Sequence, residues 1–199
     1  MKILVACEFS GVVREAFAAK GHDAWSCDLL PTEISGKHIQ GDVRKIINDP
    51  WDMILAFPEC RYLSDAGNRW FKTVPPLPQN RLELRFKAID FFLMFTETHC
   101  RKVCIENPKG IMNTIYKKPT QIICPTMFGH KEAKRTCLWL QGLPPLLPTE
   151  ARQIPVVRKL KSGRPFNPWY SCTGNPKLRP IIRSRTFPGI AEAMANQWG

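Results

Sequence analysis

The chain has 199 residues, of which 44% are hydrophobic and 10% aromatic, so it can bury a core, and one compact domain over residues 1–199 is predicted. No apolar run is long enough to span a membrane, and the first residues lack the pattern of a signal peptide, which predicts a cytoplasmic protein. The net charge of +12 is uneven: residues 1–60 hold six basic and nine acidic side chains, and residues 61–199 hold 23 basic and eight acidic ones. This asymmetry favours a phosphate-binding face and a nucleic-acid partner, although charge alone also fits a generally basic surface.

The eight cysteines are scattered through apolar segments and lack the CxxC spacing of zinc sites. Reduced thiols are therefore expected. His99, Cys100 and Cys104 form the nearest approach to a ligand cluster, but no second cluster completes it. No metal site is predicted.

Residues 2–7 (KILVAC) predict a strand, which turns at residues 8–11 into an amphipathic helix. Residues 23–27 predict a second strand that ends at Asp28. In Rossmann-like sheets, glycine after the first strand lets a ligand approach the backbone, and an acid after the second strand accepts ribose hydroxyls. Gly11 and Asp28 therefore indicate a nucleoside cofactor, but a dinucleotide fingerprint needs three glycines where only Gly11 is present, which disfavours NAD. Asp42 follows, and in isolation it also fits the N-cap of a helix over residues 43–47.

Residues 53–57 are continuously apolar, as expected of a strand buried on both sheet faces, and Pro58 ends ladder pairing. Cys60 then lies just beyond the carboxyl end of a strand, where α/β sheets bind ligands, and is a candidate nucleophile. The alternative is a buried structural cysteine. Glu59 beside the thiol would raise its pKa unless a cation such as Arg61 offsets the charge.

A proline-rich connection at residues 73–78 is predicted to be mobile or to act as a lid. A helix is predicted over residues 81–96, and a strand over residues 102–105. Glu106, Asn107 and Pro108 are predicted to lie beyond that strand, in a place equivalent to Cys60. Taken alone, Glu106 also fits a helix cap or a surface carboxylate.

Residues 121–124 and 136–140 predict two further strands, joined through a basic run at 131–135 that also fits a solvated loop. Residues 142–182 are basic, rich in proline and glycine, and predicted to be irregular. Trp169 and Tyr170 in this segment either stack on bases or anchor it to the core. Pro188 suits the first turn of a helix that continues through Ala195.

Several of these motifs resemble those of the DNA (cytosine-5) methyltransferases. Pro58 and Cys60, with Leu63-Ser64-x-Ala66-Gly67, resemble the cysteine signature, although Glu59 stands where that family has a second proline. Glu106-Asn107-Pro108 resembles the Glu-Asn-Val motif, and Gly41-Asp42-Val43 the Gly-Asp-Ile/Val motif. The family's Arg-x-Arg is matched only partly by Lys134 and Thr136, with Arg135 between them, and the Gly-Asn pair of its closing segment is missing.

The resemblance implies catalytic roles for Cys60 as nucleophile, Glu106 as partner of the cytosine N3, and the adjacent Asn107. It implies an S-adenosylmethionine site formed by seven residues: Phe9, Ser10, Gly11, Asp28, Asp42, Val43 and Pro58. It further implies substrate contacts from Ser64, Lys134 and Arg135.

The predicted fold is therefore α/β, a Rossmann-like class I methyltransferase with a mostly parallel sheet and helices on both faces. The predicted function is methyl transfer to carbon 5 of cytosine in DNA, by a compact phage-type enzyme. Residues 142–182 stand where the family has a target-recognition domain and are too few to form one. Two alternatives remain: methylation of a free pyrimidine nucleotide such as dCMP, and a binding protein whose chemistry is impaired.

Overall fold

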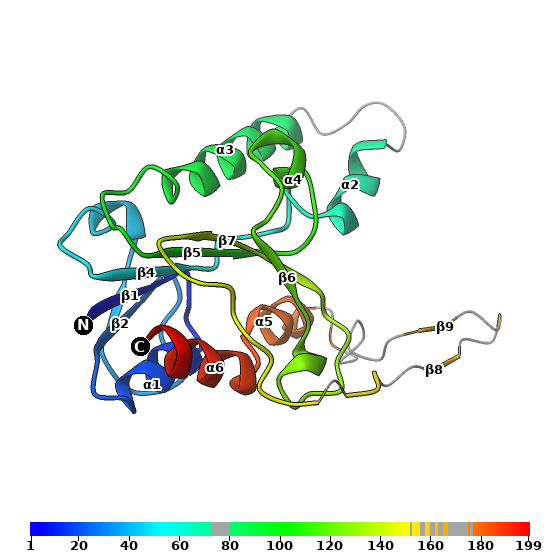
Figure 1. The fold of residues 1–199 in the computed structure, drawn as a ribbon. Coiled ribbons are helices and arrows are strands. Elements are labelled where there is room, and N and C mark those ends of the chain that lie inside the picture. The colour runs from blue at the N-terminus through cyan, green and yellow to red at the C-terminus, as the bar shows by residue number, and fades with distance from the viewer. Residues whose placement is uncertain are drawn as a thin grey trace.

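A computed structural model describes residues 1–72, 80–151, 153–155, 158–159, 162, 165–166, 175 and 177–199. Seven strands of these described residues form one sheet in the order β3-β2-β1-β4-β5-β7-β6 (Figure 1). Their bounds are β1 Lys2–Ala6, β2 Asp23–Asp28, β3 His38–Gln40, β4 Met53–Ala56, β5 Val103–Asn107, β6 Gln121–Ile123 and β7 Thr136–Gln141. β7 runs antiparallel to both of its neighbours, and the other pairs are parallel, so the predicted α/β fold with a mostly parallel sheet is confirmed.

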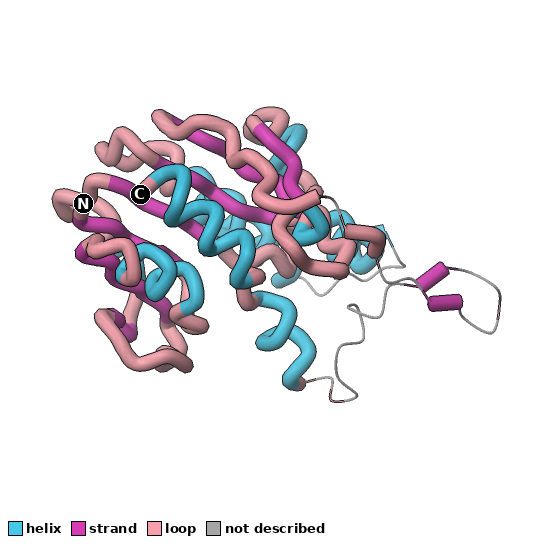
Figure 2. Tube along the Cα trace, turned by 60° about the horizontal axis from the view of Figure 1, so that its bottom comes forward, coloured by secondary structure: helices cyan, strands magenta, loops and turns pink. Residues whose placement is uncertain are grey.

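The described helices cover both faces of this sheet. They are α1 Val12–Ala18, α2 Asp65–Lys72, α3 Asn80–Met94, α4 Met112–Ile115, α5 Leu178–Ser184 and α6 Pro188–Trp198, with short 3-10 turns η1 Val43–Lys45 and η2 Pro125–Met127. Two short strands, β8 Arg158–Lys159 and β9 Pro165–Phe166, pair apart from the main sheet. Helices α1 and α6 lie on one side of the sheet and α3 on the other, as Figures 1 and 2 show.

The alternation of side chains along β1 explains why its apolar run is continuous. Ile3 and Val5 pack into the cluster beneath α1 and α6, whereas Leu4 and Ala6 pack into the cluster beneath α3. All four side chains are fully buried. A strand covered on both faces needs apolar residues at every position, so the composition of β1 follows directly from its central place in the sheet.

The order of the first five strands, 3-2-1-4-5, is that of the doubly wound Rossmann sheet. The order reverses at β1, which pairs with β2 on one side and with β4 on the other. In such sheets the ligand crevice opens at this reversal, outside the carboxyl ends of the strands. A ligand-binding site is therefore expected among the residues that follow β1, β2, β4 and β5.

Several sequence-based expectations need correction. The strand predicted at 102–105 continues to Asn107, because Glu106 and Asn107 pair with Leu138 and Cys137 of β7. Within residues 142–182, which were predicted to be irregular, the structure describes the start of α5 and the pairing of β8 with β9. β3, α2 and α4 were not foreseen either, because they are short, with three, eight and four residues.

The predicted lid at residues 73–78, and the aromatic pair Trp169 and Tyr170, lie outside the described residues. Among the helices of the described residues, none combines the length and apolar character needed to cross a bilayer.

Candidate active site

The Cys60 loop, residues 58–64, follows β4 and is a tight turn held by its own backbone. The amides of Leu63 and Ser64 donate to the carbonyl of Cys60 at 3.1 and 2.9 Å. Ser64 is buried, and its hydroxyl oxygen accepts from the amide of Gly67 at 3.3 Å. The Ser64 hydroxyl thus supports the start of α2.

Two contacts join this loop to the residues that follow β5. Asn107 is buried and donates from its side-chain amide to the carbonyl of Pro58, itself a buried residue, at 2.8 Å. Ser64 forms a bridge with Gly110, whose hydrogen atoms face the Leu63 carbonyl so closely that a Cβ would stand 2.0 Å from that oxygen. The loop that carries Cys60 is therefore built against the end of β5, which carries Glu106.

The Cys60 thiol is half-buried, and its pKa is raised above the ordinary value first by burial and then by the negative charge of Glu106. Lys134 acts in the opposite direction, and Glu59 raises the pKa as a smaller contribution. The Glu59 carboxylate faces solvent and lies 3.2 Å from the Arg61 guanidinium, so the ion pair that the sequence suggested is present. Glu106 and Lys134, which are distant in sequence, are the charges that act most strongly on the thiol.

Glu106 lies at the carboxyl end of β5 and accepts a hydrogen bond from the Thr136 hydroxyl at the start of β7. The two side chains line a cavity of about 20 Å³ together with Lys134, Ser184 and Thr186. Lys134 is half-buried and donates to the carbonyl of Arg183 at 3.1 Å. Arg135, by contrast, is exposed. Of the two basic residues predicted to contact the substrate, the structure places Lys134 beside Glu106 in the wall of this cavity.

The turn after β1 contains three of the predicted cofactor residues. Gly11 has φ = 77°, and a Cβ there would lie 2.7 Å from an Arg14 guanidinium nitrogen, so both conformation and space require glycine. Ser10 is buried and donates to Glu8 at 2.7 Å. Phe9 is half-buried, and its carbonyl accepts from the amide of Glu33 at 2.9 Å.

Glu8, which the sequence analysis did not single out, is the buried acid of this turn. One of its carboxylate oxygens accepts from the Ser10 hydroxyl and from the amide of Val13 at 3.1 Å. The other oxygen is buried without a hydrogen-bond partner among the described residues. Burial raises the pKa of Glu8, and the hydrogen bonds from Ser10 and Val13 oppose that shift.

Asp28 lies at the carboxyl end of β2 and faces the residues that follow β3. Its carboxylate accepts from the amide of Leu30 at 2.9 Å, and its carbonyl accepts from the amide of Gly41 at 2.8 Å. The carboxylate is half-buried, and burial raises its pKa. Asp28 and the Gly41-Asp42 pair are therefore adjacent.

Asp42 and Val43 have structural partners of their own. Asp42 caps η1, because its side chain accepts from the amide of Arg44 at 3.0 Å, and this cap is the alternative that the sequence left open. The Arg44 guanidinium contacts both Asp42 carboxylate oxygens, and its hydrogen bonds lower the pKa of that carboxyl. The Val43 side chain is buried in the core.

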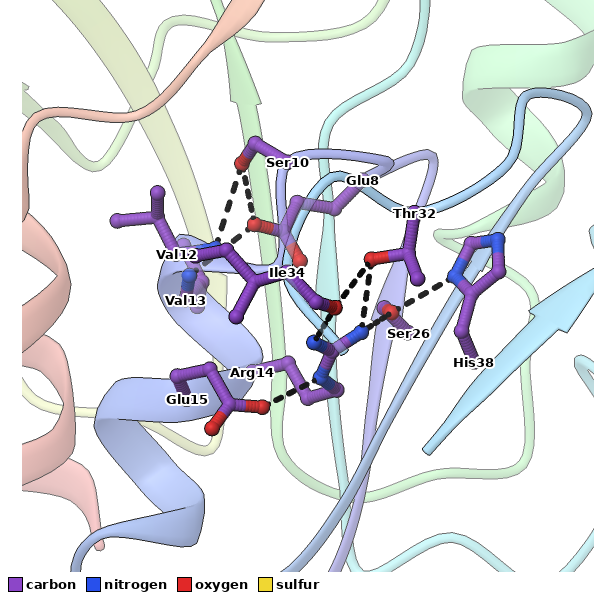
Figure 3. Close-up of polar contacts among 10 residues, drawn as sticks. All are labelled: Glu8, Ser10, Val12, Val13, Arg14, Glu15, Ser26, Thr32, Ile34 and His38. Carbon is purple, nitrogen blue, oxygen red and sulfur yellow. Dashed lines mark hydrogen bonds and ion pairs between the residues drawn. The ribbon is translucent and has the colours of Figure 1, made fainter. Parts of the chain in front are cut away.

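A buried arginine on α1 organises the loop over residues 29–36, as Figure 3 shows. Arg14 is fully buried and donates to the hydroxyls of Ser26 and Thr32 at 2.8 and 3.1 Å, and to the carbonyl of Ile34 at 2.5 Å. It also forms an ion pair with Glu15 at 2.8 Å. Sequence periodicity places a charged residue off the apolar stripe and hence in solvent, so no local signal could have identified Arg14 as a buried anchor.

The described cysteines and potential metal ligands are dispersed over the fold. All seven of the described cysteines are free thiols. Within the described part of the chain, no three His, Cys, Asp or Glu side chains come together as a metal ion would require.

Comparison with known proteins gives little beyond this geometry. The chain matches no model of a protein family and no curated protein sequence. Among solved structures it matches a proposed DNA modification methyltransferase encoded within a prophage, from E. coli, at 17% identity and a TM-score of 0.44. The match covers 69% of this chain and 45% of that one, so this chain spans less than half of the solved protein.

Proposed function

We propose that this protein transfers a methyl group from S-adenosylmethionine to carbon 5 of cytosine in DNA through a covalent adduct with Cys60. The observation that carries the proposal is the grouping of the Cys60 thiol with the charges of Glu106 and Lys134, where the loop after β4 meets the end of β5 and the residues before β7. This grouping adjoins the turn after β1 and Asp28 after β2, where the strand order reverses.

The residues around the reversal are compatible with a nucleoside cofactor. Asp28 can accept ribose hydroxyls, because its carboxylate is half-buried at the strand end and keeps lone pairs beyond those bonded to the neighbouring backbone. Gly11 leaves the turn after β1 without a Cβ, and the unpartnered oxygen of Glu8 can accept one further donor. When bound, S-adenosylmethionine would supply an electrophilic methyl group.

The chemistry assigned to the protein is the activation of a poor nucleophile. The Cys60 sulfur would add to carbon 6 of cytosine while Glu106, in its protonated form, donates a proton to N3, so that carbon 5 becomes electron-rich. After methylation, loss of the carbon 5 proton to a base, cleavage of the sulfur–carbon bond and return of the N3 proton to Glu106 restore the aromatic ring, the thiolate and the acid. Lys134 would stabilise negative charge on Cys60 before the addition.

The electrostatics also support the impaired alternative. Burial and Glu106 both hold the thiol in its protonated form, which is the unreactive one. A protein that binds cofactor and DNA without chemistry would tolerate this arrangement, whereas an enzyme must bring in the base or protonate Glu106 to offset it. The two possibilities differ in whether a methyl group is transferred at all.

The experiment is incubation with methyl-labelled S-adenosylmethionine and either duplex DNA, single-stranded DNA or dCMP. Label in DNA that is lost in Cys60→Ser and kept in Cys100→Ser supports the proposal. Cys100 is a matched control because it is a buried thiol before β5, at the opposite end of the strand from Glu106, and a serine can keep its bond to the Lys102 carbonyl. Label in dCMP alone selects the nucleotide reaction, and cofactor binding without any labelled product selects the binding protein.

A covalent trap tests the adduct itself. Carbon 5 bearing fluorine cannot lose a proton, so a duplex that contains 5-fluorocytosine should remain attached to Cys60 after methyl transfer. Mass spectrometry would then locate the nucleotide on the peptide containing Cys60. Transfer of label without any trapped complex would contradict the covalent mechanism.

A further inference from the structure

Two segments from opposite ends of the chain meet above the candidate site. One is the loop over residues 29–36, which follows Asp28, and the other is residues 183–187 between the last turn of α5 and α6, here called the strap. Arg185 donates to both carboxylate oxygens of Glu33, at 2.8 and 2.6 Å. This bidentate ion pair joins residues that are 152 positions apart.

On the cofactor side, Glu33 is also bonded to the turn after β1. Its amide donates to the carbonyl of Phe9 at 2.9 Å, so the residue that pairs with Arg185 is part of the predicted cofactor turn. Movement of Glu33 would therefore displace the backbone of Phe9. The same loop is held from beneath by Arg14 through Thr32 and Ile34.

The two arginines that hold the loop differ in their exposure to solvent. The Arg14 side chain is 1% exposed, whereas the Arg185 and Glu33 side chains are 41% and 34% exposed. An exposed ion pair is weaker and is screened by salt, whereas a buried arginine with several acceptors is costly to displace. The Arg14 anchor is therefore permanent, and the Arg185 contact is the releasable one.

The strap also forms part of the wall of the small cavity beside Glu106, which is the candidate pocket for the target base. The Arg183 carbonyl accepts from Lys134, and Ser184 and Thr186 line the small cavity with Glu106. The other end of the strap is fixed, because the buried ring of Phe187 lies 5.1 Å from that of His130.

The cavity beside Glu106, at about 20 Å³, holds about one water molecule and not a pyrimidine. A target base can therefore reach Glu106 only if neighbouring groups move, and the strap forms part of the wall. Between the Lys134 contact at Arg183 and the buried ring of Phe187, Arg185 joins the middle of the strap to the cofactor loop.

We propose that the Glu33–Arg185 ion pair is a releasable latch, with Arg185 as a positioning residue that holds the strap to the cofactor loop. The inference rests on the proposed function, because it assigns the loop to the cofactor and the cavity to the base. The closed latch orders Glu33 and Phe9 for the cofactor, and opening it separates the middle of the strap from the cofactor loop, so that the cavity wall at Thr186 can move and the base can enter. Binding events at the two ends of the latch are then coupled.

The test compares Arg185→Gln, Glu33→Gln and the charge-swapped double variant Glu33→Arg/Arg185→Glu with the wild type. Lys87→Gln is the matched control, because it removes one exposed cation from an ion pair on α3, in which Lys87 and Glu83 are 2.5 Å apart. Calorimetry with S-adenosylmethionine gives the cofactor affinity at low and high ionic strength. Amide hydrogen exchange of residues 29–36 and 183–187 measures how well the Glu33–Arg185 ion pair holds the two segments together, and it needs no ligand.

We expect each single variant to bind the cofactor about three- to tenfold more weakly at low salt, a loss that is typical of one partly exposed ionic contact. High salt should reduce the difference, and the swapped variant should recover most of the affinity. The KM for the cofactor should rise while kcat changes by less than about twofold, because the reacting groups are untouched. Amide exchange should quicken in both segments, and Lys87→Gln should match the wild type throughout.

The outcomes separate the latch from the proposed function. If the wild type binds the cofactor and Arg185→Gln binds it equally well, the latch is wrong and the proposed function stands. If the wild type binds no cofactor, the proposed function fails, and the role of the latch in cofactor binding fails with it. Unchanged amide exchange of residues 29–36 in Arg185→Gln would overturn the latch whatever the ligand.

Discussion

The side-chain amide of Asn107 donates to the carbonyl of Pro58 at 2.8 Å, and this bond joins the end of β5 to the loop that carries Cys60. Asn107 and Pro58 are both buried, so water cannot replace either partner. This bond therefore acts together with the Ser64–Gly110 bridge to hold the thiol-bearing loop against the strand that carries Glu106. This finding gives Asn107 a structural task whether or not it contacts a substrate.

Replacing Asn107 with alanine should lower the free energy of unfolding by about 2 kcal/mol, because the buried Pro58 carbonyl loses its donor. Urea denaturation followed by circular dichroism would measure the change. Asn196→Ala, at an exposed position on α6, should stay within about 0.5 kcal/mol of the wild type. Equal stability of the two variants would show that the bond contributes little.

Replacing Arg14 with methionine should destabilise the protein by about 3 kcal/mol, because Ser26, Thr32 and the Ile34 carbonyl would lose a common donor in a buried place. Thermal and urea unfolding would both report the change. The exposed Arg101 offers the matched control Arg101→Met, for which almost no change is expected. A small effect at Arg14 would mean that water can reach the loop and replace the guanidinium.

The approach of Gly110 to the Leu63 carbonyl predicts that Gly110→Ala distorts the loop after Cys60. The added Cβ would meet that backbone oxygen at 2.0 Å, so one segment must move, and we expect a loss of about 1–3 kcal/mol. Gly41→Ala is the control, since a Cβ at Gly41 meets nothing within 4 Å. If both variants unfold at the same urea concentration, the bridge between Ser64 and Gly110 does not constrain the loop.

The reactivity of Cys60 should follow the charges around it. Because burial and Glu106 raise its pKa, the thiol is protonated near neutral pH, and its alkylation rate should climb as pH rises past the ordinary thiol pKa. Glu106→Gln should quicken alkylation at pH 7.5 by about twofold or more, and Lys134→Met should slow it. Glu59→Gln should have the smaller effect, because Glu59 is the weaker influence on the pKa.

The rate is best measured by iodoacetamide labelling with mass spectrometry of the Cys60 peptide, since the chain has other thiols. A faster reaction in Glu59→Gln than in Glu106→Gln would reverse our ranking of the two carboxylates.

The raised pKa of Cys60 also has a consequence for folding. The stability that it contributes is present below the ordinary thiol pKa and is lost as pH rises through the folded-state value.

The central strands and several site residues were predictable because their signals are local. The apolar runs at residues 2–6, 53–56 and 103–105 identify strands covered on both faces, and Cys60 and Asp28 were correctly predicted to lie at or beyond strand ends. Gly11 was identified as a turn residue, and the structure adds its positive φ. Each of these features depends on residues within a few positions of one another.

The three-dimensional arrangement alone decided how these residues are joined. The sequence could not predict that Arg14 would be buried beneath Thr32 and Ile34, nor that Glu33 would pair with Arg185, because such contacts depend on how the loops pack over the sheet. It also pointed to Glu59 as a carboxylate that raises the pKa of Cys60, whereas burial and Glu106 raise that pKa more strongly. Local periodicity encodes which residues are buried, but the electrostatic environment of a side chain depends on charges brought near it by folding.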